Sequence, residues 1–119
     1  MLLRQRPLLL TFALISMTAS AQTVADIDGN VYNTVTINGQ EWMAENLATS
    51  RYQDGTPIPL LSSPTSWYNS IVTGARCFYW NDSALIAPSY GALYNWNAVS
   101  SPLNVCPSGW HVPSDDEWN

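Results

Sequence analysis

The residues with the clearest potential for chemistry are aromatic side chains in an irregular segment. Trp67, Tyr68 and Trp80 stand among Pro, Ser and Asn in a stretch without strand or helix periodicity. Because no spacing assigns them to a core face, we predict that they contact a ligand, with Trp67 and Tyr68 the leading candidates. Aromatic faces can stack on sugar rings, while Asn, Asp and Gln bond the hydroxyls. The alternative is that these rings fill a loop-rich core.

Two cysteines and one histidine are the other reactive side chains. In an exported chain, Cys77 and Cys106 are candidates for a disulfide. The competing interpretations are two buried free thiols, or pairing with cysteines outside this chain. Because His111 is the single histidine and no close cysteine pair exists, no metal site is predicted. No catalytic nucleophile, base and orienting group come together, and no cofactor is implied.

Residues 26–30 (D-I-D-G-N) resemble part of a calcium loop. The bidentate Glu of that motif is missing, because Ile37 occupies the twelfth position. Asp-Gly also supplies the positive φ of a tight turn. We therefore favour a turn over a calcium site.

Composition restricts the class of protein. The chain has 119 residues, a net charge of −5 and no lysine. Nucleic acids and anionic membrane surfaces need a basic patch, so neither is a predicted partner. Six Trp, six Tyr and two Phe make the chain too aromatic for a disordered segment, so we expect one small domain.

The first 21 residues have the three parts of a signal peptide. Arg4 and Arg6 give a positive start, residues 8–17 are apolar, and residues 19–21 (A-S-A) precede the cleavage point. The apolar run covers about half of the roughly 20 residues that span a bilayer, so the mature chain has no predicted membrane span. We predict cleavage between Ala21 and Gln22 and a secreted location: extracellular, at the outer surface or in the periplasm.

A β-hairpin is the strongest local prediction. Residues 31–37 and 40–44 are strand-like, and Asn38-Gly39 between them favours a type I′ turn. Trp42 lies on the second strand and is expected to be structural. The β-branched residues on both strand faces predict partial cover on each side.

The rest of the chain is predicted to be loop-rich. Four prolines interrupt residues 48–89, where one short strand is expected over residues 76–80. Residues 90–99 predict a short helix whose apolar face carries Trp96. Ser114 and Glu117 form a capping box with Trp118 at its end, so a second helix starts where this sequence stops. We therefore expect a truncated domain.

Five blocks of sequence resemble one family. They are residues 26–32 (D-I-D-G-N-V-Y), 40–47 (Q-E-W-M-A-E-N-L), 52–59 (Y-Q-D-G-T-P-I-P), 90–96 (Y-G-A-L-Y-N-W) and 106–114 (C-P-S-G-W-H-V-P-S). In this order they resemble the Fibrobacter succinogenes major paralogous domain. The resemblance makes residues 22–119 the N-terminal portion of one such domain and implies a secreted or surface protein.

A shorter resemblance concerns the fold. Residues 92–96 and 110–118 are similar to segments of formylglycine-generating enzymes, which have a C-type-lectin-like fold. The resemblance implies an α+β domain with twisted antiparallel strands and two short helices. The catalytic cysteines of those enzymes would lie beyond Asn119, so no activity is carried over.

Three classes of function remain. The first is an extracellular module that binds polysaccharide through aromatic loop residues. The second is a structural or adhesive surface domain without a small ligand. The third, an enzyme of the formylglycine-generating type, has the least support in the residues.

Overall fold

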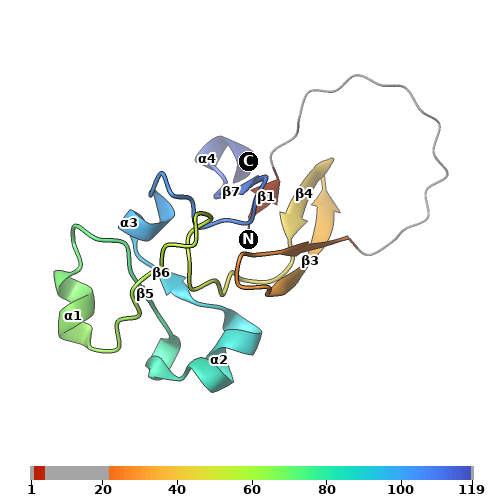
Figure 1. Ribbon diagram of the computed structural model, residues 1–119. Helices are drawn as coiled ribbons and strands as arrows, with labels where there is room; N and C mark the ends of the chain where they lie inside the picture. Colours follow the sequence, from red (N-terminus) through yellow and green to blue (C-terminus); the bar gives the residue numbers. More distant parts are fainter. Residues whose placement is uncertain (1, 5–21, 119) are drawn as a thin grey trace, which may run out of the picture.

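The structure, a computed structural model, describes residues 2–4 and 22–118 and shows a mixed α+β architecture. The larger sheet is antiparallel, with strand order β2-β3-β4-β1-β7, and β5 and β6 form a second, two-stranded antiparallel sheet. Figure 1 shows the large sheet on one side of the chain and the small sheet, with α1 and α2, on the other. The strands are β1 (Leu3–Arg4), β2 (Thr23–Ala25), β3 (Val31–Ile37), β4 (Gln40–Met43), β5 (Arg76–Cys77), β6 (Leu93–Tyr94) and β7 (Trp110–His111).

The helices are short, and several begin at a side-chain cap. The oxygens of Ser63, Asp82 and Asn95 each accept a backbone N–H at the start of a helix. No helix in the described ranges is long and apolar enough to cross a membrane. The helices are α1 (Pro64–Asn69), the 3₁₀ helix η1 (Tyr79–Asn81), α2 (Ser83–Tyr90), α3 (Trp96–Val99) and α4 (Asp115–Trp118).

The predicted hairpin is confirmed. Strands β3 and β4 pair across a two-residue turn in which Asn38 (φ 50°) and Gly39 (φ 76°) are both left-handed. Trp42 is buried on β4, as expected for a structural residue. The face of β3 differs from the expectation, because Tyr32 points into the core while Val31 is exposed.

The prolines of residues 48–89 do not exclude helices, contrary to the prediction. Pro64 occupies the first turn of α1, where its missing N–H has no helical partner to lose. Pro88 lies inside α2, which ends two residues later at Tyr90. The predicted strand over residues 76–80 is present but shorter, since only Arg76–Cys77 pair.

The helix predicted over residues 90–99 is wrong. Gly91 (φ 65°) ends α2, and the Cβ of any other residue there would lie 2.5 Å from the Leu47 carbonyl oxygen. Leu93 then pairs with β5, and Asn95 starts α3 as a new helix. Trp96 is 76% exposed, so the prediction that it faces the core is wrong, and Ala98 is the buried residue of α3.

The C-terminal capping box is formed. The Ser114 backbone N–H and hydroxyl each donate to Glu117 at 2.8 Å. Trp118 is exposed on one side, while its ring lies 5.1 Å from that of Trp42. Both roles fit the structural assignment of these residues.

One core joins the large sheet to the following loops. Tyr32 on β3 donates its hydroxyl to Asp26 and accepts the Ala48 N–H. Tyr94 on β6 donates to the Thr49 carbonyl oxygen at 2.7 Å. The two tyrosines thus hold residues 48–49 between the sheets. The buried cluster consists of Leu2, Tyr32, Met43, Leu47, Tyr52, Ile58, Ala98, Val105, Cys106 and Trp110.

Part of the predicted leader lies in the large sheet. Most of residues 1–21, including the predicted cleavage point, lies outside the described residues. Leu3 and Arg4 form β1 between β4 and β7, and Leu2 reaches the core. No strand was expected from this segment, because its apolar character was assigned to export.

Candidate functional site

Two adjacent aromatic rings form an exposed platform on η1. The rings of Tyr79 and Trp80 stack with centroids 5.3 Å apart and planes 17° apart. Trp80 is 83% exposed and Tyr79 is 59% exposed. We call this pair the aromatic platform. Flat, solvent-facing apolar rings of this kind are suited to contact with a ligand or partner.

A shallow groove lies next to the platform. It has a volume of about 160 Å³ and is lined by both α1 and η1 residues. The Asn81 side-chain amide closes one side by donating to the Ser62 carbonyl oxygen at 2.8 Å. We call it the α1–η1 groove. Its lining residues are Leu61, Ser62, Ser63, Pro64, Trp67, Cys77 and Asn81.

The three predicted contact residues occupy different positions. Trp67 is half-buried and lines the α1–η1 groove. Tyr68, its neighbour on α1, is 81% exposed, and Trp80 belongs to the aromatic platform. The structure brings Trp67 to the groove beside Asn81, the residue after Trp80, but gives Tyr68 no ring contact.

The backbone of η1 explains how Trp80 reaches solvent. Trp80 (φ 54°) and Asn81 (φ 58°) are both left-handed, a conformation that costs a non-glycine residue about 1–2 kcal/mol. Such strain concentrates at functional sites. The sequence analysis missed Tyr79, because no local pattern indicates that the chain turns here and stacks two neighbouring rings.

The groove carries hydroxyl and amide groups but no carboxylate or basic side chain. Ser62, Ser63 and Asn81 supply its polar atoms. Burial raises the pKa of the Cys77 thiol, which keeps it neutral at physiological pH. This chemistry suits a neutral, hydroxyl-rich ligand. The volume lies below the roughly 300–1,000 Å³ of drug-sized sites, so the groove fits one ring-sized group.

The predicted disulfide between Cys77 and Cys106 is not formed. Both are free thiols in the structure. Cys77 lies on β5 opposite Leu93, whereas Cys106 is buried in the main core. The number of residues between two cysteines does not determine whether their Cβ atoms come within bonding distance, and here the fold places them in different environments.

A second, polar pocket of about 340 Å³ lies between the 26–30 turn and residues 105–108. Gln53 spans it by donating to the carbonyl oxygens of Cys106 and Pro107. Burial raises the pKa of the Cys106 thiol to about 12, so this sulfur is protonated at neutral pH and is a poor nucleophile. The other lining residues are Ala25, Asp26, Ile27, Thr49, Arg51, Val105 and Ser108.

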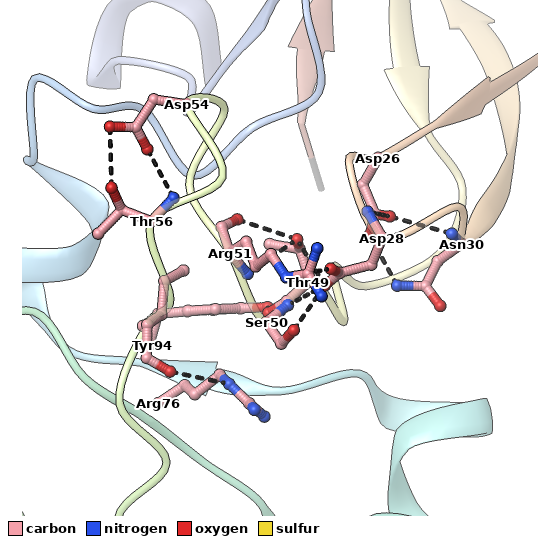
Figure 2. Close-up of polar contacts among 11 residues, drawn as sticks. Asp26, Asp28, Asn30, Thr49, Ser50, Arg51, Asp54, Thr56, Arg76 and Tyr94 are labelled. Atoms are coloured by element: carbon pink, nitrogen blue, oxygen red, sulfur yellow. Dashed lines mark hydrogen bonds and ion pairs between the residues drawn. The ribbon is translucent and has the colours of Figure 1, made fainter.

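The turn predicted for residues 26–30 is formed, and its acids bond to the protein. The Asp26 carboxylate accepts from the N–H groups of Asp28 and Asn30. Asp28 accepts from the backbone N–H and hydroxyl of Ser50 and from the Thr49 hydroxyl, as Figure 2 shows. These contacts favour the turn over the calcium interpretation. Within residues 2–4 and 22–118, no group of three His, Cys, Asp or Glu could hold a metal ion.

The hydrogen bonds to Asp28 have a consequence for acid stability. Burial alone raises the pKa of this carboxyl, but the donors from Ser50 and Thr49, with the Arg51 charge, outweigh it and hold the pKa below the ordinary 3.8. A carboxyl with a lower pKa in the folded state stabilises the fold above its unfolded pKa. That contribution is lost as the pH falls through the folded value.

We therefore expect Asp28→Asn to flatten the pH dependence of unfolding. The difference in unfolding free energy between wild type and variant should shrink as the pH falls from about 5 toward 2.5. Urea denaturation at several pH values measures it. Glu117, whose pKa the Ser114 donors also lower, keeps part of the slope in the variant. Parallel pH curves for the two proteins would contradict the assignment to Asp28.

The fold defines a small α+β domain built on an antiparallel sheet, with exposed aromatic residues at its helical end. The chain belongs to the Fibrobacter succinogenes major domain family, whose model matches residues 35–119. The match confirms the family expected from the sequence motifs. No curated protein and no solved structure matches the chain.

Proposed function

We propose that this protein is a secreted or cell-surface module that binds glycans without catalysing their breakdown. The aromatic platform supplies the stacking surface, and the α1–η1 groove supplies the polar atoms. Tyr68 extends the aromatic contact from α1, and Trp67 shapes the groove wall. Export through the leader at residues 1–21 is part of the proposal.

The observation that carries the proposal is the exposure of Trp80 in a left-handed backbone. A tryptophan that is 83% exposed contributes little to the core, and its backbone conformation costs stability. The stacked Tyr79 ring beside it enlarges the flat apolar surface. A binding role gives both costs a reason, since ligand contact recovers what folding alone does not.

We expect Trp80→Ala in the full chain to weaken retention by polysaccharide about 30-fold. Truncating a tryptophan that anchors an interface typically costs 2 kcal/mol or more, which corresponds to this factor. Affinity electrophoresis through gels containing xylan, mixed-linkage β-glucan or soluble chitosan measures the loss. The melting temperature should stay within a few degrees, because the side chain lies outside the core.

Trp96→Ala is the matched control, since Trp96 is also highly exposed but does not line the groove. It should leave both retention and melting temperature unchanged. If wild-type protein is retained by none of these polysaccharides and binds nothing on a glycan array, the glycan proposal fails. A structural or adhesive role for the exposed aromatic surface is then the remaining candidate.

A C-type-lectin-like fold is the finer structural part of the same proposal. Antiparallel strands, short helices and long irregular connections around residues 48–89 support it. The raised pKa of Cys106 and the internal hydrogen bonds of Asp26 and Asp28 favour binding over catalysis. An experimental structure of the domain with a bound oligosaccharide tests both the fold and the site.

A further inference from the structure

Strand β1 occupies an internal position of the large sheet. It pairs antiparallel with β4 on one side, where Leu3 lies opposite Trp42. On the other side it pairs antiparallel with β7, with Leu3 opposite His111 and Arg4 opposite Trp110. The sheet therefore has a strand position between β4 and β7 with hydrogen-bonding partners on both sides, which we call the β4–β7 slot.

The slot has a definite chemical preference. Leu2 and Leu3 are 6% and 4% exposed, and Leu2 belongs to the main core. The Leu2 carbonyl oxygen accepts the Met43 N–H at 2.9 Å. Arg4 leaves the slot toward solvent and pairs with Glu41 at 3.0 Å. Two apolar residues followed by a basic one thus match two buried positions and one acid.

These residues belong to the segment that the proposed export step removes. Cleavage after Ala21 takes β1 away and leaves the facing backbone groups of β4 and β7 without their shared partner. The positions of Leu2 and Leu3 become an apolar opening in the sheet. Unpaired strand edges of this kind are templates for another strand.

We propose that the mature chain binds, in the β4–β7 slot, an extended segment of a different protein with the pattern apolar-apolar-basic. The inference rests on the leader removal included in the proposed function. The segment runs antiparallel to both β4 and β7 and places its basic side chain at Glu41. Main-chain hydrogen bonds supply the general affinity, and the two apolar positions and the acid supply selectivity.

The basic residues of this chain argue against a second mature copy as the donor. After removal of the leader, Arg51 and Arg76 are the basic residues of the printed sequence. Arg76 is already paired on β5, and Arg51 is bridged to Pro57. Neither follows two apolar residues, because Thr49-Ser50 and Gly74-Ala75 precede them.

The test uses the full chain with a site-specific protease sequence inserted between Ala21 and Gln22. After cutting, a fluorescent peptide of residues 1–6 (MLLRQR) is titrated and its anisotropy is followed. We expect saturable binding to the cut protein and at least about tenfold weaker binding to the uncut protein, whose slot holds β1. The control peptide carries Leu2→Asp and Leu3→Asp and should not bind.

A charge exchange tests the position of the basic residue. Cut protein with Glu41→Arg should prefer a peptide with Arg4→Glu by about fivefold, the scale of a partly exposed ion pair. If the cut protein loses its near-ultraviolet circular dichroism, recovery with MLLRQR but not with the control peptide supports the slot. Absence of recovery overturns it, as does equal binding of all peptides by cut and uncut chains.

Light scattering separates the remaining occupant. A dimer of cut protein that excludes the peptide would overturn the proposal in favour of a second copy. Because the cut is introduced by protease and the readout is peptide binding, failure here leaves polysaccharide retention through Trp80 unaffected. Loss of glycan binding alone would likewise leave the slot proposal standing.

Discussion

Replacing Trp42 by alanine should lower the free energy of unfolding by about 3–5 kcal/mol, as large-to-small changes at buried aromatic positions do. Trp42 is 5% exposed in the middle of the large sheet, opposite Val35 on β3 and Leu3 on β1. Its ring also contacts Trp118 on α4. The change removes packing from three strands and one helix at once. Urea denaturation followed by far-ultraviolet circular dichroism measures it.

Trp96→Ala provides the control for Trp42. The same change at a side chain that is 76% exposed should cost no more than about 0.5 kcal/mol. The helical spacing of Leu93, Trp96 and Val99 predicts the opposite, since it places Trp96 on a buried face. Comparable losses for the two variants would show that the α3 position of Trp96 is wrong.

The contrast between these tryptophans shows where local sequence determines the fold. The hairpin is predictable because Asn38-Gly39 can adopt two consecutive positive φ angles that few other pairs tolerate. The C-terminal cap is predictable because Ser114 and Glu117 are three residues apart. In both cases the information lies within a few neighbouring residues.

Two-residue strands carry no such information. Leu93 and Tyr94 fit a helical pattern, but Gly91 ends the preceding helix and β5 offers a strand partner from 17 residues away or more. Strand β1 exists only because β4 and β7 flank it. A segment this short has no period of its own, so the distant partner decides its conformation.

The candidate site was predictable in part for the same reason. Tyr68 and Trp80 are exposed, in line with their lack of periodicity. Tyr79 was missed, because its stacking depends on the left-handed backbone of Trp80. The cysteine pairing failed because separation along the chain contains no information about the distance between Cys77 and Cys106 in the fold.

Asp26→Ala should lower the free energy of unfolding by about 3 kcal/mol. The Asp26 carboxylate is 8% exposed and satisfies four donors. Asn30 provides two of them, from its backbone N–H at 3.0 Å and its side-chain amide at 2.8 Å. The Asp28 N–H and the Tyr32 hydroxyl, at 2.9 and 2.6 Å, provide the others. Losing charge-assisted hydrogen bonds at a buried carboxylate typically costs about 1.5–3 kcal/mol each, and part is recovered by water.

A double-mutant cycle with Tyr32→Phe isolates the buried contact within this turn. Tyr32→Phe alone should cost about 1–1.5 kcal/mol, because the Asp26 carboxylate keeps its three other donors. The double variant should cost less than the sum of the single losses, since either change already breaks the hydroxyl–carboxylate bond. Chemical denaturation of all four proteins supplies the coupling energy. Additive losses, or an Asp26→Ala cost below about 1 kcal/mol, would show that the turn is held by Gly29 and the β2–β3 pairing instead.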